Sequence, residues 1–168
     1  MRGEGRSRSG SAREEVVITI TETRNELAPP EGRRRIVVGF DGSDSSIKAL
    51  DWAIAEAAHA PAVIDVVTAW TFPMVMGYAF TTTVSEVDHA ARDLVDHALT
   101  HVAEIAPDVT VRGVAVDGAA GPALVQAGRA ADMLVVGSRG HGGWHGVLLG
   151  SVSAYVARHA PCSVVIIR

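Results

Sequence analysis

Lysine and cysteine each occur only once in this chain of 168 residues. The single cysteine, Cys162, cannot form an intramolecular disulfide, and a zinc site with two cysteine ligands is likewise excluded. A chain without disulfides fits a reducing compartment, so we expect a cytoplasmic protein. The single lysine, Lys48, is not part of a Gly-Lys-Ser/Thr sequence, which excludes the phosphate-binding loop known as Walker A.

Long apolar runs are also missing. Every apolar stretch is interrupted well short of the roughly 18 residues that a membrane-spanning helix needs. The Arg-rich start of the chain lacks the apolar segment of about 7–15 residues found in secretory signals. We therefore expect no membrane association. The chain is nevertheless 48% hydrophobic and 20% charged, a composition that predicts a buried core and excludes a wholly disordered chain.

Charge is unevenly distributed. Residues 1–35 hold eight arginines and six glutamates, whereas residues 36–168 hold seven basic and thirteen acidic side chains. Because the glutamates nearly balance the arginines, the basic segment gives little reason to expect nucleic-acid binding. We interpret residues 1–33 as an Arg-rich, largely disordered extension that contains one β-prone stretch at 16–21, and residues 34–168 as a single domain.

Apolar runs alternate with segments of helical periodicity along this domain. A helix is expected from a cap at Ser43 or Asp44 to Pro61, and three more at 87–105, 122–130 and 151–159. Strands covered on both faces read as near-continuous apolar runs, which predicts a parallel sheet and a doubly wound α/β fold. The predicted strands are 36–40, 63–70, 109–116, 133–136 and 162–167.

A glycine-rich loop at 137–150 joins the fourth predicted strand to the last helix. Glycines let backbone amides approach a phosphate without interference from Cβ, and a helix N-terminus adds unpaired N–H donors. The loop therefore suits an anion such as a polyphosphate, although a loop that only turns sharply would need the same glycines. The fingerprint of Rossmann dinucleotide-binding proteins is absent after the first strand, where the chain reads Gly-Phe-Asp-Gly-Ser at 39–43.

The spacing Gly137-x2-Gly140-x9-Gly150-Ser151 makes the pattern more specific. Combined with Val-Gly-Phe-Asp-Gly-Ser at 38–43 and with segments 131–140 and 160–165, it resembles the ATP-binding branch of the universal stress protein family. The resemblance covers residues 34–168. It implies a five-stranded sheet of order 3-2-1-4-5 with helices on both faces, a Rossmann-like fold related to the adenine nucleotide α-hydrolases. It also implies a homodimer paired through the last strand, 162–168.

The resemblance further implies a site for ATP with Mg²⁺. In this strand order the ends of the first and fourth strands face one crevice, which brings Asp41 and Gly137 together. Asp41 would lie near the ribose or a phosphate-bound Mg²⁺, the end of the second strand near adenine, and the glycine loop around the phosphates. The nucleotide-binding residues implied in this way are Gly39, Asp41, Thr68, Ala69, Val136, Gly137, Arg139, Gly140, Gly150, Ser151 and Val152.

Two functions remain open at this point. The first is a regulatory protein in which bound ATP changes the dimer or its affinity for protein partners that the sequence does not identify, with at most weak ATPase activity. The second is a hydrolase of the adenine-nucleotide type, since 41–45 faintly resembles the pyrophosphate loop of those enzymes. No catalytic residues and no metal ligands of the protein's own are predicted. A phosphoacceptor receiver domain is disfavoured because no lysine follows Lys48.

Three further features have an ordinary structural interpretation beside a functional one. The apolar segment 71–83 suits a lid, a subunit contact or packing on its own domain. The histidines at 89, 97 and 101 indicate a solvated helix face more strongly than a metal site. We expect Cys162 to be a buried, inert thiol.

Overall fold

The computed structural model describes residues 32–72, 83–141 and 149–168. The strands in these ranges form one five-stranded parallel sheet of order β3-β2-β1-β4-β5. This is the predicted strand order and the predicted Rossmann-like fold. The expectations for residues 1–31, for 73–82 and for the part of the glycine-rich loop at 142–148 concern residues outside these ranges. The strands are β1 (Arg34–Gly39), β2 (Ala62–Trp70), β3 (Thr110–Asp117), β4 (Met133–Gly137) and β5 (Ser163–Ile167).

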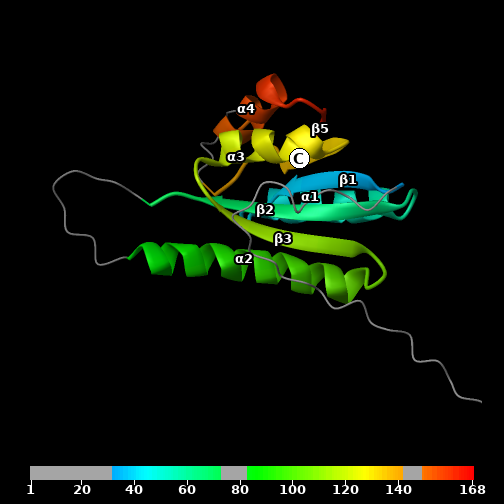
Figure 1. Cartoon of the computed structure of the whole chain (residues 1–168), viewed down its shortest axis with the longest axis horizontal. Coiled ribbons are helices and arrows are strands. Elements are labelled where there is room, and N and C mark those ends of the chain that lie inside the picture. The colour runs from blue at the N-terminus through cyan, green and yellow to red at the C-terminus, as the bar shows by residue number, and fades with distance from the viewer. Residues whose placement is uncertain (1–31, 73–82, 142–148) are drawn as a thin grey trace, which may run out of the picture.

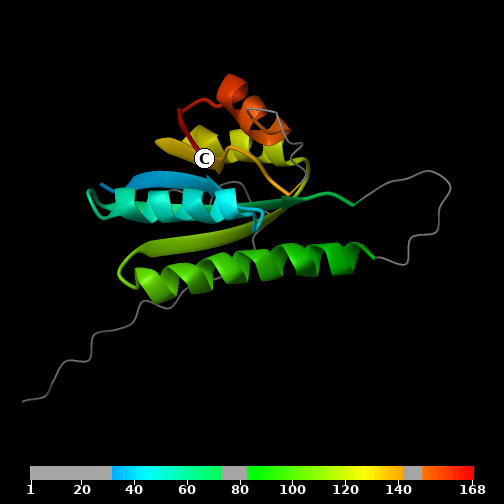
Figure 2. The same ribbon diagram turned by 180° about the vertical axis from the view of Figure 1, so that it is seen from behind.

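Helices cover both faces of the sheet, as Figures 1 and 2 show from opposite sides. They are α1 (Asp44–Ala57), α2 (Val84–Ile105), α3 (Ala120–Ala127), which continues into a short 3-10 turn at Gly128–Ala130, and α4 (Ser151–His159). Side chains of β1 alternate between the faces: Ile36 and Val38 pack with α1 and α2, and Val37 packs with α3 and α4. No helix in the described part of the chain is long and apolar enough to cross a membrane.

The helix boundaries follow from local capping. Ser43 is the N-cap of α1, and its hydroxyl accepts a hydrogen bond from Ser46 N at 3.3 Å. At α2, Thr83 and Glu86 each bond the other's backbone amide, so both ends of this reciprocal cap are satisfied.

The histidines of α2 and the single cysteine lie outside the cavity lining. His89 is exposed, and His101 Nε2 lies 2.7 Å from Asp51 Oδ1 on α1. Among the described residues, no three His, Cys, Asp or Glu side chains gather in a way that could hold a metal ion. Cys162 is only partly buried, and this burial raises the pKa of its thiol, which favours the less reactive protonated form.

A buried ion network under α3 was not foreseen from the sequence. The carboxylate of Asp65, in the middle of β2, is fully buried and accepts from Arg35 Nε at 2.5 Å and from Arg112 Nε at 2.6 Å. The Arg35 side chain is 3% exposed and also donates to the carbonyl of Ala127 at 3.3 Å. Buried charges are tolerated only when they are paired in this way, so each group depends on the others. The network joins β1, β2 and β3 to the end of α3.

Replacing Asp65 with alanine should therefore destabilise the fold far more than removing an exposed ion pair. We expect Asp65→Ala to lower the free energy of unfolding by about 3–5 kcal/mol, because it leaves the guanidinium of Arg35 buried without its carboxylate. The control is Glu56→Ala, which removes a partly exposed pair with Arg34 and should cost about 1 kcal/mol or less. Urea denaturation measures both. Equal losses in the two variants would contradict this account of the network.

Candidate functional site

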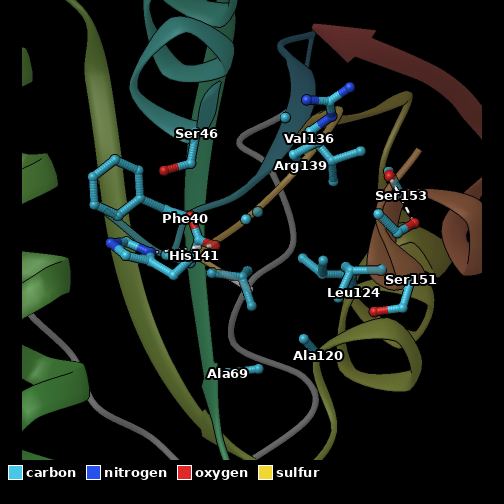
Figure 3. A pocket seen from close by; sticks show the side chains of 17 residues that line it. Phe40, Ser46, Ala69, Ala120, Leu124, Val136, Arg139, His141, Ser151 and Ser153 are labelled. Atoms are coloured by element: carbon cyan, nitrogen blue, oxygen red, sulfur yellow. Dashed lines mark hydrogen bonds and ion pairs between the residues drawn. The ribbon is translucent and has the colours of Figure 1, made fainter. Parts of the chain in front are cut away.

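The chain reverses its winding direction between the central strand β1 and its neighbour β4. After β1 it turns into α1 on one face, and after β4 it leads to α4 on the other. Such a reversal opens a crevice at the carboxyl ends of the strands. A cavity of about 390 Å³ lies there (Figure 3). It is lined by Gly39, Phe40, Asp41, Ser46, Val67, Ala69, Ala120, Leu124, Val136, Gly137, Arg139, Gly140, His141, Gly150, Ser151, Val152 and Ser153.

The structure brings together ten of the eleven residues named from the sequence resemblance, from four separate segments of the chain. The exception is Thr68, which is buried beneath the cavity and does not line it. Its hydroxyl donates to the carbonyl of Phe40 at 2.9 Å, and Phe40 N donates to the carbonyl of Val67 at 3.0 Å. Thr68 therefore holds the chain after β1 against β2, while its neighbour Ala69 lines the cavity.

Sequence reasoning missed the apolar wall that α3 contributes. Ala120 and Leu124 lie four residues apart on this helix, so both point to the same side, and both line the cavity (Figure 3). The helix expected at 122–130 left Ala120 out, whereas α3 begins at Ala120, and only the fold shows that α3 packs against β1 and β2. Val67 could have been found from Ala69, because alternate residues of a strand share a face.

One end of the cavity is apolar and offers backbone. It is formed by Val67, Ala69, Ala120, Leu124 and Val136. The register of β2 with β1 ends at Val67, whereas its register with β3 continues to Trp70. The last residues of β2 therefore extend beyond β1, where they have no neighbouring strand on that side. This end suits a flat apolar group that also makes a few backbone hydrogen bonds.

Asp41 contributes a negatively charged side chain to the cavity lining. Its carboxylate accepts from the Ser43 hydroxyl at 2.6 Å and from Ser43 N at 3.1 Å, and His141 Nδ1 lies 3.8 Å away. Partial burial on its own raises the pKa of Asp41, but the hydrogen bonds from Ser43, with help from Ser46 and His141, outweigh it and hold the pKa below its usual value. Asp41 is therefore ionised at neutral pH.

The glycine loop approaches α1 and Asp41 very closely. A Cβ at Gly137 would lie 2.7 Å from the backbone carbon of Ser45, whose hydroxyl donates to the carbonyl of Arg139. A Cβ at Gly140 would lie 2.3 Å from Asp41 Oδ2. A side chain at position 137 would therefore clash with the backbone of Ser45, and one at position 140 would displace the Asp41 carboxylate.

Gly150 differs from these two glycines. Its φ is −66°, and the protein atom nearest to a Cβ there would be the Ser138 carbonyl oxygen at 3.4 Å. Gly150 N donates to that same oxygen at 2.8 Å, and the buried Ser153 hydroxyl lies 2.9 Å from it. The first turn of α4 is thus fixed to the end of β4. Ser151 and Val152 follow at the cavity edge, where the amides of a helix's first turn have no partner within the helix.

These features define a doubly wound α/β protein with a cavity at the reversal point of its sheet. The chain belongs to the universal stress protein family, whose family model matches residues 32–168. It is 39% identical over 144 residues to the universal stress protein Rv2623 of Mycobacterium tuberculosis, an alignment that covers 79% of this chain and 47% of the relative. The chain thus spans about half the length of the curated relatives it matches.

Solved structures agree with this assignment. A universal stress protein crystallised in complex with cAMP is 32% identical, with a TM-score of 0.62, over 82% of this chain and 98% of the other. A family member from Arabidopsis thaliana with AMP bound shares the fold at 20% identity and a TM-score of 0.56, over 80% of this chain and 90% of the other.

The position of Ser43 predicts how Asp41 titrates. Since the pKa of Asp41 in the folded protein lies below the unfolded value, its ionisation stabilises the fold at neutral pH, and this contribution is lost as the pH falls through the folded-state pKa. We expect Ser43→Ala to raise the pKa of Asp41, measured by NMR titration of the carboxyl carbon, and to cost about 1 kcal/mol through the lost cap of α1. The control, Ser45→Ala, leaves both hydrogen bonds to Asp41 in place. An unchanged titration in Ser43→Ala would contradict the assigned cause.

Proposed function

We propose that the protein binds ATP, with Mg²⁺, in the cavity between β1 and β4 and acts in the cytoplasm as a nucleotide-dependent regulator of a stress response. The observation that carries this proposal is that one cavity is lined both by apolar side chains of β2 and α3 and by polar groups at Asp41 and the first turn of α4. An adenine nucleotide combines the same two kinds of group. The relative at 32% identity that was crystallised with cAMP supports a nucleotide as the ligand.

The residues present fit such a ligand. Adenine would lie against Ala69 and the α3 wall, with the backbone at Ala69 offering hydrogen bonds, and the ribose would lie beside Gly39, Val136 and Gly137. The phosphates would lie among Arg139, Gly140, Gly150, Ser151 and Val152, where the helix N-terminus favours negative charge.

Mg²⁺ fits only as an ion brought by the nucleotide. Mg²⁺ is usually bound through one or two carboxylates together with substrate phosphates and water, and Asp41 is the carboxylate that lines the cavity. Asp41 would therefore contact either a phosphate-bound Mg²⁺ or the ribose.

The alternative is a hydrolase of the adenine-nucleotide type. A general base needs a pKa near the working pH, and the lowered pKa of Asp41 makes this carboxylate a weak one. We therefore favour storage of the nucleotide with at most slow hydrolysis. Incubation with ATP distinguishes the two functions, because an enzyme would release ADP or AMP through many turnovers and a regulatory protein would not.

Gly150 offers the sharpest test of the phosphate position. Because alanine is compatible with its φ and meets no protein atom closer than 3.4 Å, Gly150→Ala should fold normally and place its methyl group where the phosphates are proposed to bind. We expect calorimetry to show ATP binding weakened by about tenfold or more, equivalent to roughly 1.4 kcal/mol.

The matched control is Gly128→Ala, since Gly128 has φ −65°, a nearest neighbour at 3.3 Å and no place in the cavity. It should bind ATP as the wild type does. Wild-type affinity in Gly150→Ala would contradict the proposed phosphate position.

We also propose a homodimer paired through the last strand, 162–168. β5 is an edge strand of the sheet, so one side of its backbone has no neighbouring strand in the described chain, and four of its five residues are apolar. We expect sedimentation velocity to give twice the chain mass of 17.6 kDa. Hydrogen exchange at 163–167 should slow as the protein concentration rises. A monomer at all concentrations, or exchange that does not depend on concentration, would contradict this interface.

A further inference from the structure

The apolar end of the cavity depends on where α3 lies, and α3 has little to hold it in place by itself. It has eight residues, including Gly121 and Pro122, and its N-cap Ala119 makes no side-chain capping bond. Helices this short are marginal in isolation, so packing against other elements must fix α3. Leu124 provides the inner contact, since a Cβ at Gly39 would lie 2.9 Å from its Cδ1.

The outer contact comes from Tyr155 on α4. A Cβ at Gly121 would lie 2.7 Å from Tyr155 Cδ1 and 2.9 Å from its Cγ, so the aromatic ring lies directly against the backbone of the first turn of α3. Gly121 is buried, whereas Tyr155 is 37% exposed and does not line the cavity. The side chain therefore acts on the cavity through α3, at the residue next to Ala120.

Tyr155 also contacts His159, one turn further along α4. The ring of His159 stacks on it at 4.2 Å between centroids and 23° between planes, and His159 Nδ1 lies 2.8 Å from the carbonyl oxygen of Tyr155. The Tyr155 ring thus contacts both His159 and Gly121. A larger residue than glycine at position 121 could not keep this contact, and a smaller residue than an aromatic at position 155 would leave the first turn of α3 without support.

We propose that Tyr155 is a positioning residue for the nucleoside end of the cavity: through Gly121 it keeps Ala120 and Leu124 of α3 at the distance from Ala69 and Val136 that an adenine ring needs. This inference rests on the proposed function, and it assigns the α3–α4 contact to recognition of the base. Ser151 and Val152, which the proposal places at the phosphates, lie on the same helix before Tyr155 and are fixed separately through Ser138. Loss of the ring should therefore affect the two ends of the nucleotide differently.

The test compares ligands that share the phosphates but differ in the nucleoside. We expect Tyr155→Ala to weaken ATP and AMP by a similar factor of about ten, the scale of one lost aromatic contact, and to bind inorganic tripolyphosphate within about twofold of the wild type. Tyr155→Phe keeps the ring and should bind all three ligands normally. Ser153→Ala, which loosens the first turn of α4 at the phosphate end, should show the opposite pattern and weaken tripolyphosphate.

Gly121→Ala provides a second variant if Tyr155→Ala fails to fold. Its methyl group pushes the ring and α3 apart from the other side of the same contact, and it should produce the same selective loss of ATP and AMP. Unchanged ATP binding in folded Tyr155→Ala, or an equal loss of ATP and tripolyphosphate, would overturn the positioning role. A wild type that binds no nucleotide would instead refute the proposed function, so the two failures are distinguishable.

Discussion

The parallel pairing of β1 with β4 is the constraint on which the site depends. Gly39 and Val136 are partners at the end of this pairing, and the chain then leaves toward opposite faces of the sheet. Asp41 follows the end of β1 and the glycine loop follows the end of β4, so both line the same crevice. Neither segment forms a cavity alone. The proposed nucleotide site follows from the strand order before any individual side chain is considered.

Buried polar contacts then fix the shape of the rim. The backbone of Ser138 is central: its N–H donates to the carbonyl of Ile167 at 2.6 Å, and its carbonyl accepts from Gly150 N at 2.8 Å. One residue thus joins the ends of β4 and β5 to the start of α4. On the other face, Ser45 ties the loop to α1. These contacts fix residues 138 and 150–153, which the proposed function places at the phosphates, and groups held in place before binding reduce its ordering cost.

Much of this arrangement was predictable from the sequence, because it depends on patterns among residues that are close together in the chain. Apolar runs and helix caps gave the strands and helices within a few residues, and ten of the eleven residues named through the family resemblance line one cavity. What the sequence could not show depends on contacts between distant elements. The partners of Asp65, the direction of Thr68 and the wall of α3 are examples. A buried aspartate and an ordinary short helix carry no local sign of what they touch.

The central claim is that the cavity binds an adenine nucleotide, and direct identification of a bound molecule tests this claim best. Protein purified without added nucleotide is denatured, and the small molecules it releases are identified by mass spectrometry, with ATP titration by calorimetry for any empty fraction. The account predicts an adenine nucleotide at near one per chain, or an empty protein that takes up ATP with one site per chain. A protein that releases no nucleotide and gives no heat with ATP would contradict it.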